Sequence, residues 1–112
     1  MLKAMALGAD AFYIGYPVAI AAVYTQLNRL PAGASPADLY LYEGKLTELL
    51  DIDEAASCAG NFLKALQEEI DIAVRCLGKT SVHQLNKDDL VALTREMAEI
   101  TGVRLGYNIH SV

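Results

Sequence analysis

The spacing of apolar and polar residues predicts a mainly helical chain, and the clearest helix covers residues 51–77. Apolar residues recur there at intervals of three and four, which is the period of one buried helix face. Asp51 and Glu54 match a capping box at its start, and Gly78 is suited to end it. The predicted buried stripe is Ala55, Ala59, Phe62, Leu66, Ile70, Ala73 and Leu77, and the opposite solvated face is Lys64, Gln67, Glu68, Asp71 and Arg75.

A second helix is predicted near the C-terminus, from an N-cap at Asn86 to a stop at Gly102. Asp88 and Asp89 complement the positive end of its dipole, and Leu85 and Leu90 can form a hydrophobic staple. Its predicted buried stripe is Leu90, Leu93, Met97 and Ile100, and residues 103–112 form a tail.

The N-terminal part predicts a short helix, a short strand and a longer helix. Residues 3–7 continue a helix that ends at Gly8, and the apolar run Ala11–Ile14 is consistent with a buried strand. Gly15 breaks that run, and Pro17 suits the first turn of a helix that continues to residue 30. The part from Val18 to Val23 is apolar on all sides, which is typical of a helix buried all round. Residues 31–36 are a loop, and residues 37–50 are irregular with a short helix.

Length and charge exclude several classes of protein. A chain of 112 residues is long enough for one domain and too short for a complete (β/α)₈ barrel of about 250 residues. Its net charge is −5 and its basic residues are scattered, which argues against nucleic acid binding. The uncharged stretch 11–24 is too short to cross a bilayer and is interrupted by Gly15 and Pro17, so we expect no membrane segment and no secretion signal.

The two cysteines, Cys58 and Cys76, fall in the same predicted helix. At the usual rise they lie about 27 Å apart along it, so they cannot form a disulfide within the chain. Two unpaired thiols indicate a reducing compartment, and we expect a cytoplasmic protein.

One segment offers candidate chemistry, the turn at Gly15 and Tyr16. A strand that ends in glycine ahead of a helix lets backbone N–H groups approach a phosphate, although such a glycine more often only makes a turn. His83 and His110 have no metal-ligand spacing, and neither Glu68–Glu69 nor Asp88–Asp89 reads as an acid–base pair. No catalytic residue and no metal ligand is therefore predicted.

Four runs in the chain resemble glutamate synthase in the order in which that family has them. The first resembles the end of its FMN-binding domain, and the others resemble the segment after the barrel in archaeal-type members. The runs are Leu2-Lys3-Ala4-x-Ala6-Leu7-Gly8-Ala9-Asp10-Ala11-x-Tyr13-Ile14-Gly15, Asn61-Phe62-Leu63-x-Ala65-Leu66-x-Glu68-Glu69, Gly78-Lys79-x-x-Val82-His83-x-Leu85-Asn86-x-x-Asp89-Leu90 and Ala98-Glu99-Ile100-Thr101-Gly102-Val103.

The resemblance implies a (β/α)₈ flavoprotein that uses FMN and an iron–sulfur cluster to reduce 2-iminoglutarate to glutamate. Gly15 and Tyr16 match its FMN-phosphate turn, although the family more often has a small residue in the second place. The family usually shows Cys-x-x-Cys and a further Cys past the next helix. Here those stretches read Tyr24-Thr25-Gln26-Leu27 and Leu30-Pro31-Ala32-Gly33, so the thiolate ligands of a cluster are missing.

These observations predict a mainly α fold, a helical C-terminal fragment of a (β/α)₈ FMN barrel with about one short strand and three to four helices. We expect one domain over 1–112, with 1–30 a remnant of the last βα unit and 51–102 a helical extension. The isolated chain should hold no cofactor, and FMN would bind only if a barrel-forming partner completed the site. The rival hypothesis is a non-catalytic helical homo-oligomer, most simply a dimer, or an interaction module of unknown role, because an uncovered strand and an all-apolar helix need a partner surface.

Overall fold

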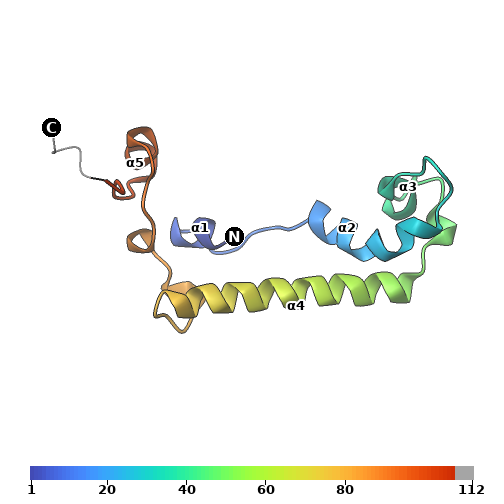
Figure 1. The fold of residues 1–112 in the computed structure, drawn as a ribbon, viewed down its shortest axis with the longest axis horizontal. Helices are drawn as coiled ribbons and strands as arrows, with labels where there is room; N and C mark the ends of the chain where they lie inside the picture. The colour runs from blue at the N-terminus through green and yellow to red at the C-terminus, as the bar shows by residue number, and fades with distance from the viewer. Residues whose placement is uncertain (108–112) are drawn as a thin grey trace. The chain divides into compact units, whose positions relative to one another are not determined.

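The computed structural model describes residues 1–107 and is mainly helical, as the sequence predicts (Figure 1). The α-helices are α1 (Leu2–Ala6), α2 (Tyr16–Val23), α3 (Pro36–Tyr40), α4 (Ile52–Cys76) and α5 (Arg95–Thr101). Short 3₁₀ helices lie between them: η1 (Tyr24–Arg29), η2 (Thr47–Leu49), η3 (Val82–Gln84) and η4 (Lys87–Asp89).

The chain divides into two compact units, which are described separately. Unit 1 consists of residues 1–12 and the described residues from 69 onward, and unit 2 consists of Tyr13–Glu68. Helix α4 contributes its first part to unit 2 and its last part to unit 1. The single domain over 1–112 that the sequence suggests stays a prediction.

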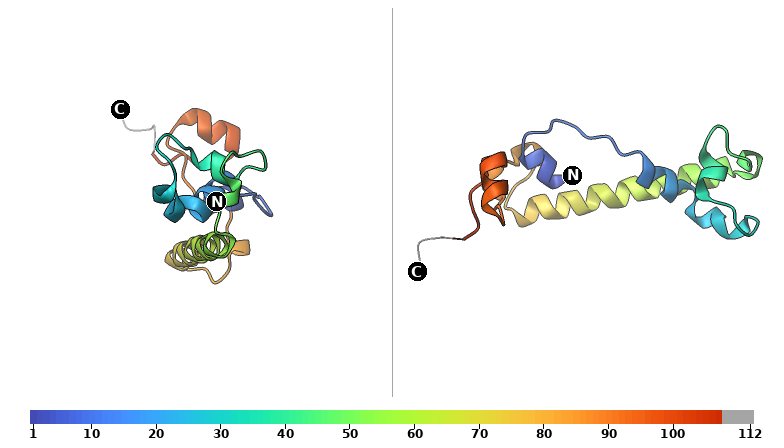
Figure 2. Two further views of the ribbon diagram at one scale, coloured as in Figure 1. Left: turned by 90° about the vertical axis from the view of Figure 1, so that its right-hand side faces the viewer. Right: turned by 90° about the horizontal axis from the view of Figure 1, so that it is seen from above.

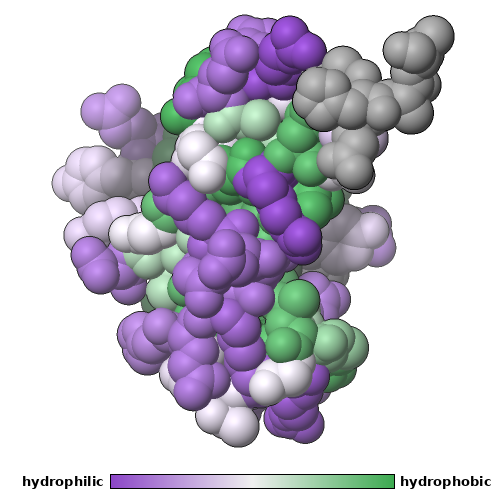
Figure 3. All heavy atoms as spheres, turned by 90° about the vertical axis from the view of Figure 1, so that its left-hand side faces the viewer, coloured by the Kyte–Doolittle hydropathy of each residue, from purple (hydrophilic) through white to green (hydrophobic). Residues whose placement is uncertain are grey.

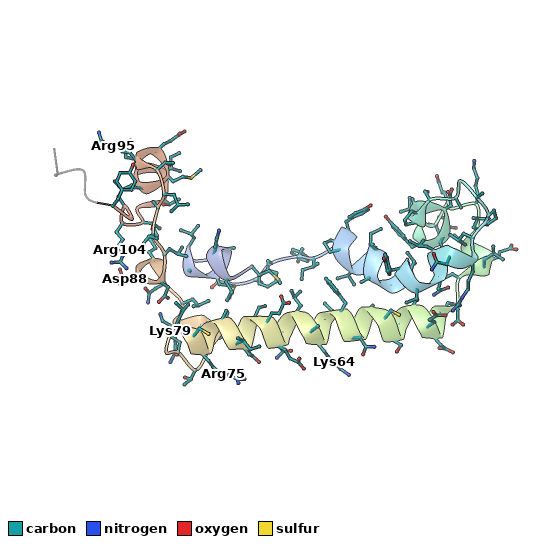
Figure 4. All side chains as sticks on the ribbon, viewed as in Figure 1. Lys64, Arg75, Lys79, Asp88, Arg95 and Arg104 are labelled. Carbon is teal, nitrogen blue, oxygen red and sulfur yellow. The ribbon has the colours of Figure 1, made fainter. Side chains whose placement is uncertain are left out.

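Helix α4 confirms the clearest sequence prediction. The side chains expected on its solvated face are all exposed, and Figure 4 shows Lys64 projecting away from α2. The expected apolar stripe is buried or half-buried from Ala55 to Ala73, whereas Leu77 at its end is exposed. The capping box is half realised: Asp51 Oδ1 accepts the N–H of Glu54 at 3.0 Å, but the Glu54 carboxylate binds Arg29 instead of the Asp51 N–H.

In unit 2, α2 packs against η1 and α3, and α3 packs against η2; Figure 2 shows these short elements gathered together. Its buried hydrophobic residues are few: Val23, Leu39 and Ala55. Ser35 and Asp38 form a full capping box at the start of α3. The expected helix up to residue 30 is confirmed in outline, because α2 continues into η1 and the helical stretch ends before Pro31.

Unit 1 has its own small core, in which Ala6 of α1 packs with Val74 of α4 and Leu85. Partly buried apolar side chains surround this cluster: Leu2, Met5, Ile70, Val82 and Leu90. Apolar side chains are also visible between hydrophilic ones on the face drawn in Figure 3.

Two sequence predictions are wrong. Residues 11–14 form no strand, and residues 1–107 contain no strand at all, only an isolated pairing of Ala92 with Leu105. The physical reason is that an extended segment needs a neighbouring strand to bond its N–H and C=O groups, and the described residues offer none.

Within residues 1–107, no α-helix combines the length and apolar character needed to cross a membrane.

The second wrong prediction concerns the last helix, which starts at Thr94 and not at Asn86. Asn86 caps only the 3₁₀ turn η4, through a capping box with Asp89. The chain is extended at Leu90, and the Thr94 side chain accepts the N–H of Met97 to begin α5. The stripe expected to be buried is exposed in its main part, at Leu93, Met97 and Ile100.

Candidate functional site

The two residues predicted to contact a phosphate, Gly15 and Tyr16, lie at the start of α2. Gly15 is the N-cap, and its carbonyl oxygen accepts the N–H groups of Val18 and Ala19 at 3.1 Å each. No side chain caps this helix end, and Pro17 lies in its first turn as the sequence predicts. A Cβ added at Gly15 would meet nothing within 4 Å, so the backbone of the turn is open to approach.

A shallow apolar groove of about 680 Å³ begins at the same helix end and lies wholly within unit 2. One wall is formed by α2 and η1, and the other by the first part of α4. Its lining carries no charged side chain: Tyr16, Pro17, Ile20, Ala21, Tyr24, Thr25, Cys58, Asn61 and Phe62. Residues 16, 20 and 24 repeat at intervals of four, and so do 17, 21 and 25, which places each set along one side of the helical wall.

The groove brings Cys58 beside Thr25, which lies in η1. The Thr25 Oγ1 and Cys58 Sγ atoms are 3.6 Å apart, and the thiol is half-buried. The sequence placed Cys58 on a later helix and did not predict this contact. Cys58 and Cys76 are both free and both lie on α4, as expected.

The two positions that the resemblance assigns to cluster thiolates hold Tyr24 and Leu27, neither of which carries a thiol. Within residues 1–107 no group of three histidine, cysteine or acidic side chains is arranged to hold a metal ion. The intervening Gln26 is buried, with 2% of its surface exposed. Its side-chain amide donates from Nε2 to the Asp51 carbonyl oxygen and accepts the Asp51 N–H at Oε1, both at 2.9 Å.

Next to this amide pair, Arg29 and Glu54 form a two-point ion pair. Arg29 donates to the Glu54 carboxylate oxygens at 2.6 and 3.1 Å. The hydrogen bonds from Arg29 lower the pKa of Glu54, and its charge adds to the effect. Residues of η1 therefore fix the beginning of α4 through an amide and a guanidinium.

The remaining polar candidates have structural partners or lie apart from the groove. His83 is exposed in η3 within unit 1, and His110 lies outside the described residues. Asp89 accepts a 2.6 Å bond from Lys79 Nζ, which lowers the pKa of that carboxyl, and the Asn86 N–H lowers it further. Lys79 also donates to the Gln84 carbonyl oxygen at 2.6 Å, so the Asp89 carboxylate holds a loop together.

The sequence did not predict the groove, and it did not predict the two hydrogen bonds between the Gln26 side chain and the Asp51 backbone. The four-residue repeat of Tyr16, Ile20 and Tyr24 was a usable signal for the first. The Gln26–Asp51 hydrogen bonds cannot be predicted from the sequence, because a glutamine that binds backbone groups 25 positions away has no local pattern.

Comparison with curated proteins finds two relatives. A glutamate synthase large subunit-like protein of Rhizobium meliloti is 32% identical over 119 residues, covering 92% of this chain and 27% of that protein. An archaeal glutamate synthase [NADPH] of Methanocaldococcus jannaschii is 31% identical over 108 residues, covering 93% of this chain and 21% of that protein. No family model matches the chain, and no solved structure matches it.

The chain thus spans about a quarter of the length of the curated relatives that it matches. The two alignments include almost every residue of the chain and agree with the resemblance drawn from its four runs. Over more than nine-tenths of its length, the chain is homologous to proteins named as glutamate synthases.

Proposed function

We propose that this chain is a C-terminal piece of a glutamate synthase-like FMN oxidoreductase and acts only when a barrel-forming polypeptide completes it. The observation that carries the proposal is the homology to two glutamate synthase relatives over at least 92% of the chain. The complete assembly would form glutamate by reducing 2-iminoglutarate, with the reducing equivalents carried by FMN.

Within that assembly, the start of α2 would contact the FMN phosphate. Gly15 leaves open space beside the backbone, no side chain occupies the helix end, and Tyr16 is 69% exposed. The Tyr16 N–H and the dipole at such a helix start favour an anion, whereas Pro17 has no N–H and the N–H groups of Val18 and Ala19 already donate to Gly15. These features fit a phosphate group.

The described residues do not fit an iron–sulfur cluster. Tyr24 and Leu27 replace the first two thiolates, and Cys58 supplies a single sulfur atom beside Thr25. A cluster needs several thiolate or imidazole ligands around it. We therefore propose that the chain alone is catalytically inactive and binds neither redox centre.

Flavin binding after co-expression tests this proposal. The chain is purified alone and after co-expression with the barrel-forming segment of the curated archaeal relative. We expect a colourless protein in the first case, and flavin absorbance in a stable complex in the second. Gly15→Val in the complex should reduce the FMN retained, because its side chain would crowd the phosphate, while Gly60→Val on α4 serves as the glycine control.

Retained FMN with turnover in the lone polypeptide would contradict the proposal, as would a complex that holds no flavin. Iron and acid-labile sulfide are measured on the same samples after anaerobic purification. Stoichiometric iron and sulfide in the isolated chain would contradict the proposal that it binds no iron–sulfur cluster.

The second candidate function is a helical homo-oligomer without catalysis. The uncharged groove of unit 2 favours it, because such a surface is suited to protein contact.

A further inference from the structure

We propose that the peptide bonds after Phe12 and Tyr13 are a cleavage site for an endopeptidase that selects aromatic side chains. Both bonds lie in the stretch of residues 10–15 between α1 and α2, which Figure 1 draws without helix or strand. The proposal concerns the chain by itself and does not depend on the proposed enzyme assembly.

The backbone of this stretch is not hydrogen-bonded to other residues within 1–107. The Ala9 N–H donates to the Ala4 carbonyl oxygen at 2.9 Å, and the Gly15 carbonyl oxygen accepts from the first turn of α2. From residue 10 to residue 14, no backbone N–H or C=O group bonds to another described residue. No hydrogen bond of the fold therefore has to break before a protease binds this stretch.

The side chains of the stretch are accessible as well. Residues 10–13 are exposed, and Tyr13 is fully so. Proteases of the chymotrypsin type select an aromatic side chain next to the bond that they cut, because that side chain fills a hydrophobic pocket. Phe12 and Tyr13 place two such side chains in a row at an accessible part of the backbone.

Three other exposed tyrosines lie where the backbone is hydrogen-bonded. Tyr16 and Tyr24 belong to α2 and η1. Tyr42 is 100% exposed, but the Gly44 N–H closes its turn by donating to the Leu41 carbonyl oxygen at 2.8 Å. Helices and closed turns have to open locally before a protease can bind them, so these positions should be cut more slowly.

The chain passes between its two compact units at two places, and only the first is open to cleavage. The first part of unit 1 ends at Phe12 and unit 2 begins at Tyr13, inside the stretch without backbone hydrogen bonds. The second passage, from Glu68 to Glu69, lies within the continuous helix α4. We therefore expect cleavage at the first passage and protection at the second.

The reaction is the hydrolysis of one peptide bond. A cut after Tyr13 consumes one water molecule and leaves a carboxylate on Tyr13 and an ammonium group on Ile14. Helix α1 is then no longer joined to α2, and it is held only by its contacts in unit 1, chiefly those of Ala6 with Val74 and Leu85. Cleavage thus converts α1 from a tethered helix into a separate peptide.

Limited digestion of the full chain with chymotrypsin, followed by mass spectrometry, tests the proposal. Within residues 1–106 we expect the first cut after Phe12 or Tyr13, at least about tenfold faster than any other. The double variant Phe12→Ser with Tyr13→Ser should slow this cut at least about tenfold, because the pocket of the protease is then left unfilled. Tyr42→Ser is the matched control and should leave the rate unchanged, and circular dichroism verifies that all variants keep their helix content.

Elastase provides a second readout, because its pocket accepts small side chains. It should cut after Ala11, in the same stretch, at similar rates in the unaltered chain and in the double variant. This measurement reports the accessibility of the backbone independently of the two aromatic side chains.

A first chymotryptic cut elsewhere within residues 1–106 would overturn the proposal. Resistance of the unaltered chain to elastase at Ala11 would do the same, since the backbone of the stretch would then be protected. Equal slowing of the chymotryptic cut by Tyr42→Ser would also count against it, because the two exposed aromatic positions would then be equivalent.

Discussion

Gln26 and Asp51 exchange two hydrogen bonds of 2.9 Å each, between the side-chain amide of the first and the backbone N–H and C=O of the second. The pair joins η1 to the residue that caps α4. Because Gln26 is almost fully buried, the backbone of Asp51 is paired with protein and not with water at this point.

Replacing Gln26 with alanine should therefore destabilise unit 2. The substitution removes both hydrogen bonds and leaves space where the amide packed, and we expect a loss of about 2 kcal/mol in the free energy of unfolding. Urea denaturation followed by circular dichroism measures it. Gln67→Ala, on the exposed face of α4, should change stability by less than about 0.5 kcal/mol. Equal midpoints for the two variants would show that the amide pair contributes nothing.

Two glycine-to-alanine substitutions should have opposite signs. A Cβ at Gly44 would lie 2.3 Å from the Asp38 carbonyl oxygen and 2.9 Å from that of Leu41. Backbone atoms cannot move aside cheaply, so Gly44→Ala should cost about 1–3 kcal/mol.

Gly60 lies inside α4, and a Cβ there would meet nothing within 4 Å. Gly60→Ala should stabilise the helix by up to about 1 kcal/mol, because alanine loses less backbone entropy on folding. Thermal denaturation of the two variants measures both effects, and a stabilised Gly44→Ala protein would show that the turn after α3 is not as tight as described.

Stability should fall in acid. Hydrogen bonds from Lys79 lower the pKa of Asp89, those from Ser35 lower the pKa of Asp38, and those from Arg29 lower the pKa of Glu54. A carboxyl whose folded pKa lies below its unfolded value, about 4, contributes stability above that pH and loses it as the pH falls through the folded value. Urea midpoints should therefore decrease from about pH 4 downward.

Asp89→Asn should make the stability depend less on pH in this range, because position 89 then has no carboxylate whose pKa Lys79 can lower. Asp71→Asn removes the same charge from the exposed face of α4 and serves as the control. Identical pH profiles for the two variants would contradict a role for the Lys79–Asp89 pair.

Substitutions of Thr94 and Asn86 test at which of the two residues α5 begins. Thr94→Ala removes the acceptor for the Met97 N–H, which lies 3.2 Å away, and should destabilise α5 by about 1 kcal/mol. Hydrogen exchange of the backbone amides in Arg95–Thr101 should accelerate. Asn86→Ala should instead leave those amides unchanged, since Asn86 caps only η4. Faster exchange in α5 after Asn86→Ala would contradict a start at Thr94 and support the longer helix that the sequence predicts.

Sequence predicted those elements whose signals are local. The long apolar repeat, Pro17 and the glycines at 78 and 102 located α4 and the helix ends correctly. The sequence did not predict where α5 begins, because Asn86 and Thr94 are both favourable N-cap residues. In the structure Asn86 caps η4 and Thr94 caps α5, and the extended backbone at Leu90 lies between these two helices.

The candidate site was predictable only in part. Gly15 and Tyr16 were found because a glycine before a helix has a recognised local pattern, and they do lie at the start of α2. The groove between α2, η1 and α4 depends on contacts between residues more than 30 positions apart, such as Thr25 with Cys58. Periodicity along one helix does not reveal which other helix it will pack against.

The hydrogen bonds between Gln26 and Asp51 have a consequence for the neighbouring positions 24 and 27. The two hydrogen bonds that join Gln26 to Asp51 involve neither Tyr24 nor Leu27, so those two positions can vary in sequence without loss of this connection between η1 and α4.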